Sequence, residues 1–378
     1  MKKAFSVLGM SLALLLACTP KQKENLTLSG LNPANFETTV DGQTVSLYTL
    51  KNAAGMEVCI TNFGGRLVSV TVPDKEGTMT DVILGFDNIN DYQNIPTDFG
   101  ASIGRYANRI NQGKIIIDGV EYQLPQNNYG HCLHGGPEGW QYKVYEAKQP
   151  NNTQLELVLN SPDGDSNFPG NVTAKVTYTL TEDNAIDITY EATTDKKTVI
   201  NMTNHAYFNL NGNPAVQGMN QILYIASDSI TPVDDTFMPT GEMMAVAGSP
   251  FDINTPKAIE QDIQADNEQL TFGKGYDHNW VLNTKGDITK MAAKLTSPVT
   301  GITMEVYTNE PGVQVYTGNF LDGTVTGKKG IVYPQRASVC LETQHYPDTP
   351  NKAHWPSALL EPGQTYHSQC IYKFGIEK

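Results

Sequence analysis

Long amphipathic helical patterns are nearly absent from this chain of 378 residues, and clusters of positive charge are scarce. Without helical periodicity, a fold built from packed helices is not expected. The chain has 26 Lys and Arg against 40 Asp and Glu, which gives a net charge of −14. Phosphate binding needs clustered Lys and Arg, so the acidic balance excludes nucleic acid as a partner.

Motifs for cofactors are also missing. There is no glycine fingerprint of a dinucleotide site, and residues 323–329 are one residue short of a phosphate loop. His131 and His134 have no second pair at zinc-like spacing, and the oxygen-rich residues 161–167 lack the closing acid of a calcium loop. We predict no metal ligands and no required cofactor, while a bound cation such as calcium stays open.

The cysteines show no CxxC spacing. Cys59, Cys132, Cys340 and Cys370 are far apart in a chain long enough to fold without disulfides. We expect four free, mostly buried thiols.

The fifth cysteine, Cys18, belongs to a different kind of segment. Lys2 and Lys3 precede an apolar run that is too short to span a bilayer, which predicts an export signal. The run ends in residues 15–18 (LLAC), which resemble a bacterial lipobox. We therefore predict a lipoprotein signal peptide over residues 1–17, lipidation of Cys18 and a polar tether over residues 18–31. The protein is therefore expected to be exported, as a periplasmic or outer-membrane-anchored lipoprotein that acyl chains hold to the membrane.

Period-two alternation dominates the rest of the chain. Residues 154–159, 171–180 and 185–190 each place apolar side chains on one face and polar ones on the other. Asp118 and Gly119 stand between two β-prone runs, the strongest local signal for a hairpin. No linker or repeat divides residues 32–378. These features predict a single all-β domain of many antiparallel strands packed as face-to-face sheets.

Several polar segments exceed what a plain β-sandwich needs. Residues 201–210 (NMTNHAYFNL) set His205 among amides and aromatics in a run that otherwise looks like a buried strand. Taken alone, such a histidine is more often a satisfied core residue than a general acid. Glu342 and Asp277 each stand among apolar residues, Glu342 at the end of an expected strand, where burial is costly unless the carboxylate is bonded or functional. For each of these acids alone, a strand-end residue reaching solvent is the more ordinary interpretation.

Six segments together resemble the galactose mutarotase family, the aldose 1-epimerases. They occur in that family's order, and the resemblance covers roughly residues 35 to 375. The segments are residues 107–110 (ANRI), 134–136 (HGG), 201–210 (NMTNHAYFNL), 276–279 (YDHN), 311–320 (PGVQVYTGNF) and 341–344 (LETQ). The resemblance implies a large antiparallel β supersandwich.

It also implies an activity and residue roles. Interconversion of the α and β anomers of an aldohexose such as galactose or glucose needs one general base and one general acid. By resemblance, Glu342 is the base at the C1 hydroxyl and His205 the acid at the ring oxygen, which agrees with ordinary pKa values of roughly 4.3 and 6.5. The implied substrate contacts are Asn108, Arg109, His134, Asp277 and Gln314.

Other aromatic and basic residues keep two interpretations. Trp140, Trp280, Tyr207 and Phe208 are candidates for stacking on the sugar, with core packing at least as expected for each. Arg105 is expected to be structural.

The alternative to an enzyme is a carbohydrate-binding lipoprotein of the same fold without turnover, and an epimerase of phosphorylated hexoses is disfavoured by the few basic residues. A monomer or weak dimer is expected.

Overall fold

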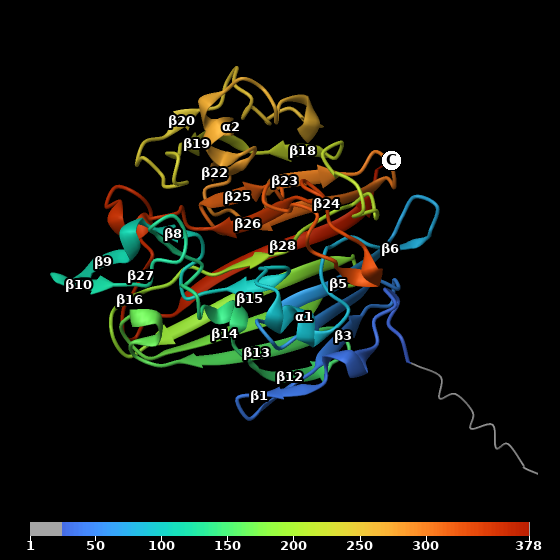
Figure 1. The fold of residues 1–378 in the computed structure, drawn as a ribbon, viewed down its shortest axis with the longest axis horizontal. Coiled ribbons are helices and arrows are strands. Elements are labelled where there is room, and N and C mark those ends of the chain that lie inside the picture. The colour runs from blue at the N-terminus through green and yellow to red at the C-terminus, as the bar shows by residue number, and fades with distance from the viewer. Residues whose placement is uncertain (1–24, 378) are drawn as a thin grey trace, which may run out of the picture.

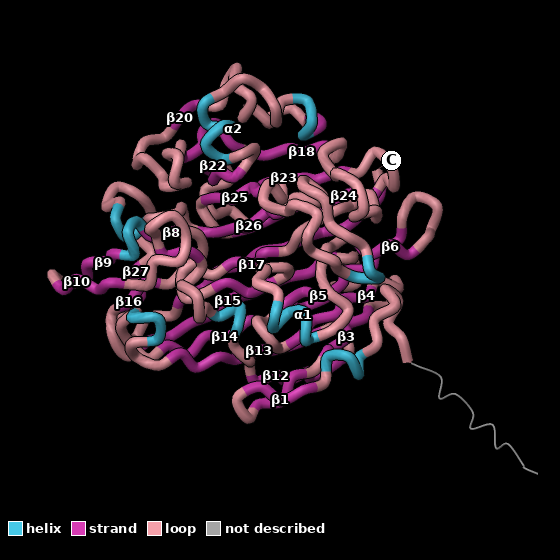
Figure 2. Tube along the Cα trace, viewed as in Figure 1, coloured by secondary structure: helices cyan, strands magenta, loops and turns pink. Residues whose placement is uncertain are grey.

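The computed structural model describes residues 25–377, and these are built almost entirely from β-strands (Figure 1). Strands make up 42% and helices 10% of the structure, so the all-β prediction is confirmed. Figure 2 shows that the helical turns are short and lie between strands or at their ends.

The largest sheet has nine antiparallel strands in the order β12-β13-β14-β15-β28-β24-β23-β18-β21. Its strands are β12 (Glu146–Asn151), β13 (Gln154–Ser161), β14 (Val172–Leu180), β15 (Ala185–Thr194), β28 (Tyr366–Ile376), β24 (Ile302–Thr308), β23 (Met291–Thr296), β18 (Ile222–Ile225) and β21 (Lys257–Ala258). Three of these strands, β13, β14 and β15, cover the alternating segments that the sequence predicts as strands.

Two further sheets have five and four strands. The five-stranded sheet has the order β20 (Met244–Ala245), β19 (Ser227–Thr231), β22 (Asp277–Leu282), β25 (Gly312–Tyr316) and β26 (Cys340–Gln344). The four-stranded sheet has the order β3 (Leu47–Lys51), β4 (Glu57–Thr61), β5 (Arg66–Pro73) and β6 (Met79–Asp81).

Five two-stranded pairs and short helical turns complete the described fold. The pairs are β1 (Thr38–Val40) with β2 (Gln43–Val45), β7 (Ala101–Ile103) with β17 (Thr203–His205), β8 (Arg109–Ile110) with β11 (Cys132–Leu133), β9 (Lys114–Ile117) with β10 (Val120–Gln123), and β16 (Thr198–Val199) with β27 (Leu359–Leu360). The helices are α1 (Ile89–Asn94), α2 (Glu268–Gly273) and the 3₁₀ turns η1 (Pro33–Phe36), η2 (Asn111–Gly113), η3 (Trp140–Tyr142), η4 (Asp165–Asn167), η5 (Ile259–Gln261), η6 (Lys328–Gly330) and η7 (Thr349–Asn351).

The predicted hairpin is confirmed. Strand β9 pairs with β10 through Ile117 opposite Val120, and Asp118 and Gly119 form the two-residue turn between them. Both turn residues have positive φ, 51° and 81°, as a type I′ turn requires.

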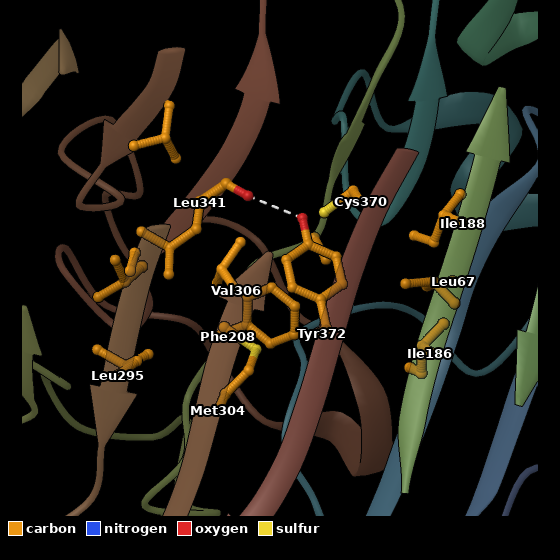
Figure 3. Close-up of a cluster of buried hydrophobic side chains, with 14 of the residues drawn as sticks. Leu67, Ile186, Ile188, Phe208, Leu295, Met304, Val306, Leu341, Cys370 and Tyr372 are labelled. Carbon is orange, nitrogen blue, oxygen red and sulfur yellow. Dashed lines mark hydrogen bonds between the residues drawn. The ribbon is translucent and has the colours of Figure 1, made fainter. Parts of the chain in front are cut away.

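The smaller sheets pack on the nine-stranded sheet through one continuous apolar core. Leu67 of β5 lies beside Ile186 and Ile188 of β15, and Leu341 of β26 lies over the β24 side chains Met304 and Val306 (Figure 3). Burial of these faces supplies the main driving force for folding, because the free energy gained scales with the apolar area removed from water.

The packed body begins earlier than the sequence predicts. Leu31 is buried, the Ser29 hydroxyl donates to that of Ser69, and the backbone N–H of Leu28 donates to Glu57. Residues 27–31 therefore pack on the domain and are not part of a free tether. The predicted signal peptide, Cys18 and the tether up to residue 24 lie outside the described residues. No helix within residues 25–377 has the length and apolar character needed to cross a membrane.

All four cysteines within the described residues are free and buried, as expected from their spacing. Burial raises the pKa of the Cys132 and Cys370 thiols to about 12, so these groups stay protonated and unreactive.

A buried hydroxyl joins the two layers next to Glu342. Tyr372 of β28 donates to the backbone carbonyl of Leu341 over 2.7 Å, and its ring meets that of Phe208 edge-on at 5.0 Å (Figure 3). The contact fixes the height of β26 above the large sheet.

We predict that Tyr372→Phe lowers the free energy of unfolding by about 1–3 kcal/mol, because it leaves a buried carbonyl without this donor. Tyr190→Phe is the matched control. Tyr190 is also fully buried, but within residues 25–377 its hydroxyl has no hydrogen-bond partner, so its removal should cost little or nothing. Urea denaturation measures both; equal losses for the two variants would contradict the role of the Leu341 contact.

Candidate active site

One face of the five-stranded sheet is polar although it is buried. Gln314 on β25 stands opposite both Asn279 on β22 and Glu342 on β26, so these three residues form a row across the sheet. The adjacent row contains Asp277 and Tyr316. Because side chains alternate along a strand, the intervening residues turn the other way and enter the apolar core. The five-stranded sheet therefore presents polar side chains on one face and packs against the apolar core with the other.

Glu342 lies in the middle of β26, not at a strand end as the sequence suggested, and its side chain is only 1% exposed. His205 reaches it from a separate strand, β17, which pairs with β7 through His205 opposite Ala101. Nε2 of His205 lies 3.5 Å from Oε1 of Glu342. The structure thus brings together the two residues that the sequence predicts as acid and base.

Asn108, Arg109 and His134 come from the β8–β11 pair and the turns beside it. Asn108 and His134 have φ of 62° and 51°, in the sparsely populated left-handed region. Two hydrogen bonds hold them there: the His134 N–H donates to the Asn108 carbonyl over 3.0 Å, and the Asn108 N–H donates to Nδ1 of His134 over 3.1 Å. Since Nδ1 accepts a bond, neutral His134 carries its proton on Nε2, the nitrogen left available to the site.

These residues line one cavity of about 350 Å³, a volume within the range typical of small-molecule sites. Its walls contain six of the seven predicted catalytic and substrate-binding residues, namely Asn108, Arg109, His134, His205, Asp277 and Glu342. The seventh, Gln314, stands behind them and donates to Oδ1 of Asp277 over 2.7 Å. Gln314 therefore orients Asp277.

Burial changes the proton affinity of the central pair. The pKa of Glu342 is raised well above its ordinary value, first by burial and then by the charges of Asp277 and Asp98, with Arg109 opposing. Burial lowers the pKa of His205, and the charge of Asp98 opposes that shift. The argument from ordinary pKa values is therefore wrong for this site, because a dry environment favours the neutral forms of both groups.

A second buried Glu–His pair in the same chain behaves in the opposite way. Oε2 of Glu310 lies 2.7 Å from Nδ1 of His345. Despite burial, the pKa of Glu310 is lowered by the charge of His345, and that of His345 is raised by Glu310. This pair is a settled ion pair, whereas Glu342 and His205 are not.

Arg109 supplies positive charge without being neutralised. Its Nε donates to Asn128 over 3.0 Å, and its guanidinium carbon lies 4.8 Å from the centre of the Phe237 ring. Among the described residues it forms no ion pair within 4 Å, although its charge opposes the raised pKa of both Asp277 and Glu342.

Two groups of side chains bring possible metal-ligand atoms together. Asp98, His134 and His205 offer atoms within 4.8 Å of one another, as do His205, Cys340 and Glu342. A metal ion at either place would occupy His205, and burial keeps the pKa of Cys340 well above its ordinary range, which makes it a poor ligand. The donor sets therefore give no reason to assign a resident metal.

Sequence reasoning missed Asp98, which lies in the cavity wall between α1 and β7. Its neighbours Thr97 and Phe99 carry no motif, and only the pairing of β7 with β17 brings Asp98 to His205.

Tyr316 and Phe320 also line the cavity and stack on each other at 6.2 Å. Both belong to residues 311–320, one of the six segments that resemble the family, so the aromatic residues of that segment could have been predicted as part of the site.

The remaining candidates divide between site and core. Tyr207 lines the cavity and stacks on His205 at 5.0 Å. Trp140, Trp280 and Phe208 are buried in the main core, so the packing interpretation holds for them. Arg105 is buried and donates to Ser161 and to several backbone carbonyls, which confirms its structural role.

Several buried polar atoms at the site have no hydrogen-bond partner within residues 25–377. They include Nδ1 of His205, Oε2 of Glu342, Oε1 of Gln314 and Oδ1 of Asp98. Buried polar groups are normally satisfied, so a cluster of unsatisfied ones marks where a polar ligand would bond.

Residues 46–373 match the family model of aldose 1-epimerases. The aldose 1-epimerase of Escherichia coli (strain K12) is 40% identical over 339 residues, which is 89% of this chain and 97% of that protein. Human galactose mutarotase is 38% identical over 336 residues, again 89% of this chain and 95% of that protein.

Solved structures agree. The aldose epimerase homologue from C. elegans superposes with a TM-score of 0.83 at 30% identity, covering 88% of this chain and all of the other. The galactose 1-epimerase from Lactobacillus acidophilus gives 0.80 at 29% identity, covering 90% and 97%. The predicted mutarotase-like supersandwich is therefore confirmed, and the chain belongs to the aldose 1-epimerase family of isomerases.

Proposed function

We propose that this protein interconverts the α and β anomers of aldohexoses such as galactose and glucose, with Glu342 and His205 exchanging protons with the sugar. The observation that carries the proposal is the buried pair itself, a carboxyl and an imidazole 3.5 Å apart on the wall of a hexose-sized polar cavity. Family membership supplies the reaction, and the unsatisfied polar atoms of the cavity suit a ligand rich in hydroxyls.

The reaction needs two coupled proton transfers. The Glu342 carboxylate removes the proton from the C1 hydroxyl, the C1–O5 bond breaks as the C1 carbonyl forms, and Nε2 of protonated His205 delivers a proton to O5. The open aldehyde then rotates about C1–C2. Ring closure on the other face of the carbonyl reverses both transfers and releases the other anomer.

The Glu342–His205 pair holds one proton both before and after ring opening. Before opening, the proton is on His205; after opening, it is on Glu342. Burial, which raises the pKa of Glu342 and lowers that of His205, favours the second arrangement in the free site. Because the arrangements differ only in proton position, the active form is the one with a single proton on the pair, wherever that proton rests.

The other predicted residues bind and orient the sugar. Asp277 and Arg109 offer an acceptor and a donor on the Glu342 side of the cavity, and charged partners strengthen bonds to hydroxyls. His134 offers its Nε2 proton near His205, where the two rings meet edge-on at 5.2 Å. Asn108 holds His134 in place and Gln314 holds Asp277.

We predict that Glu342→Gln and His205→Asn each lower kcat by about 10²- to 10⁴-fold, the usual contribution of a general acid or base. Polarimetry of freshly dissolved α-galactose or α-glucose measures the approach to anomeric equilibrium. Glu310→Gln is the matched control, since Glu310 belongs to a buried Glu–His pair outside the cavity lining. It should keep kcat once its folding is verified by circular dichroism. A wild type that binds sugar without accelerating equilibration would support the non-catalytic alternative.

We predict that replacing Asp98 shifts the pH profile of the reaction rate. One proton on the pair predicts a bell-shaped profile: the acid limb reports binding of a second proton and the alkaline limb loss of the first. The charge of Asp98 raises the pKa of both His205 and Glu342, so Asp98→Asn makes each release its proton at lower pH. Both limbs should therefore move toward acid. Asp266→Asn, at an exposed site outside the cavity, should move neither; a limb that shifts upward in Asp98→Asn would contradict the assignment.

We also propose that the protein is exported and anchored through a lipid on Cys18. The support is the basic start, the short apolar run and the lipobox-like residues 15–18. When cells express the full chain with labelled palmitate, the wild type should incorporate label and sediment with membranes. Cys18→Ser should do neither, while Cys59→Ser, at a buried thiol, should behave like the wild type. An intact, unlabelled N-terminus in the soluble fraction would rule the anchor out.

A further inference from the structure

Phe237 is a bulky residue in an unusual backbone conformation next to the catalytic cavity. Its φ is 65°, in the left-handed region that is sparsely populated by residues other than glycine, asparagine and aspartate. For a bulky side chain this conformation is costly, and it persists only where the surrounding structure imposes it, most often at a functional site. The position of the Phe237 ring therefore needs an explanation.

The hydrophobic core does not supply that explanation. Phe237 is only 2% exposed, yet it belongs to none of the clusters of buried apolar side chains within residues 25–377. Its ring lies instead beside two aromatic rings that are each about half exposed, Tyr129 at 5.2 Å and Phe320 at 5.7 Å. Because Phe320 lines the catalytic cavity, Phe237 is buried beside the site and not in the core.

Hydrogen bonds hold the loop that carries Phe237. Oδ1 of Asp234 accepts the backbone N–H of Thr236 over 2.8 Å, and the Phe237 N–H donates to the Asp234 carbonyl over 3.0 Å. On α2, the side chain of Gln269 bonds both the N–H and the carbonyl of Val233. The loop is therefore fixed before and around Phe237, which allows it to keep the strained conformation.

The guanidinium of Arg109 lies over the Phe237 ring. Its carbon is 4.8 Å from the ring centre, within the distance at which a cation is attracted to an aromatic face. Within residues 25–377, Arg109 has one side-chain hydrogen bond, from Nε to Asn128, and no ion pair within 4 Å. Its Nη1 and Nη2 groups therefore have no protein partner among these residues.

An aromatic ring suits this position better than a carboxylate. A carboxylate paired with Arg109 would accept its N–H groups and offset its charge. The face of a ring attracts the guanidinium plane and leaves the N–H groups, which lie in that plane, available to sugar hydroxyls. Holding a long side chain in place before the sugar arrives also reduces the conformational entropy lost on binding.

We propose that Phe237 is a positioning residue that holds Arg109 for sugar binding in the catalytic cavity. Phe237 acts through Arg109 and does not itself line the cavity. This inference rests on the proposed function and adds to it a residue that determines the affinity for the sugar and leaves the proton transfers unchanged.

Fluorination of the ring tests the attraction at nearly constant shape. Each fluorine withdraws electron density from the aromatic face, so 4-fluoro-, 3,5-difluoro- and 3,4,5-trifluorophenylalanine in place of Phe237 weaken its attraction for Arg109 stepwise. We expect KM for galactose to rise with each fluorine, by about 3- to 30-fold for the trifluoro ring, while kcat stays within about twofold. Polarimetry of the full protein over a range of sugar concentrations measures both constants.

A conventional variant and a matched control accompany this series. Phe237→Leu removes the ring and keeps an apolar side chain, so it should raise KM at least as much as the trifluoro ring and keep kcat, once circular dichroism has verified its folding. The control is Phe168, whose ring lies 5.7 Å from the guanidinium carbon of Arg105. Phe168 is outside the cavity lining, so trifluorophenylalanine in its place should change neither KM nor kcat.

The outcomes separate this role from a space-filling one. A KM that does not respond to fluorination at Phe237 would overturn the proposal even if Phe237→Leu weakens binding, because the ring would then only fill space. A fall in kcat at constant KM, or an equal response to fluorination at Phe168, would also overturn it. In each of these cases the wild type still accelerates equilibration and the proposed function stands. A wild type that accelerates no sugar contradicts the proposed function, and this inference with it.

Discussion

The rest of this site depends on the burial of one carboxyl group, that of Glu342. Glu342 stands in the middle of β26, the last strand in the order of the five-stranded sheet, and its side chain is only 1% exposed, so an ionised carboxylate is costly there. The cost is only partly offset by Arg109, because Asp277 and Asp98 act in the other direction. A rigid support is needed to hold a group in so unfavourable a place. The five-stranded sheet gives it, with its apolar face packed on the large sheet and Tyr372 bonded to the residue just before Glu342.

The two buried Glu–His pairs show that proximity alone does not make a site. Glu310 and His345 are 2.7 Å apart, and each stabilises the charged form of the other, so their proton is fixed. Glu342 and His205 are 3.5 Å apart, but burial is the largest cause of the shift in both pKa values and favours the neutral form of each group. Glu342 and His205 line the catalytic cavity, whereas Glu310 and His345 are outside its lining.

Sequence patterns predict the parts of this molecule that depend on local periodicity. Alternation gave the long strands β13 to β15, and the Asp118-Gly119 turn gave a hairpin, because both are decided by neighbours in the chain. The site depends on contacts between distant segments, and only the resemblance to a family joined Glu342 to His205. Asp98 carries no motif and was missed. The raised and lowered pKa values could not be predicted from sequence, because they follow from burial.

The direction of those shifts suits a reaction that must run both ways. With ordinary pKa values of 4.5 and 6.5, moving the proton from His205 to Glu342 would cost about 3 kcal/mol, and the cost would fall only on ring opening. Raising the first value and lowering the second opposes that bias. Since anomer exchange requires acid and base to swap roles within each turnover, the shifts act on the step that ordinary pKa values would make costly, the transfer of the proton from His205 to Glu342. The dry, rigid position of Glu342 is therefore a condition of the chemistry as well as a cost to stability.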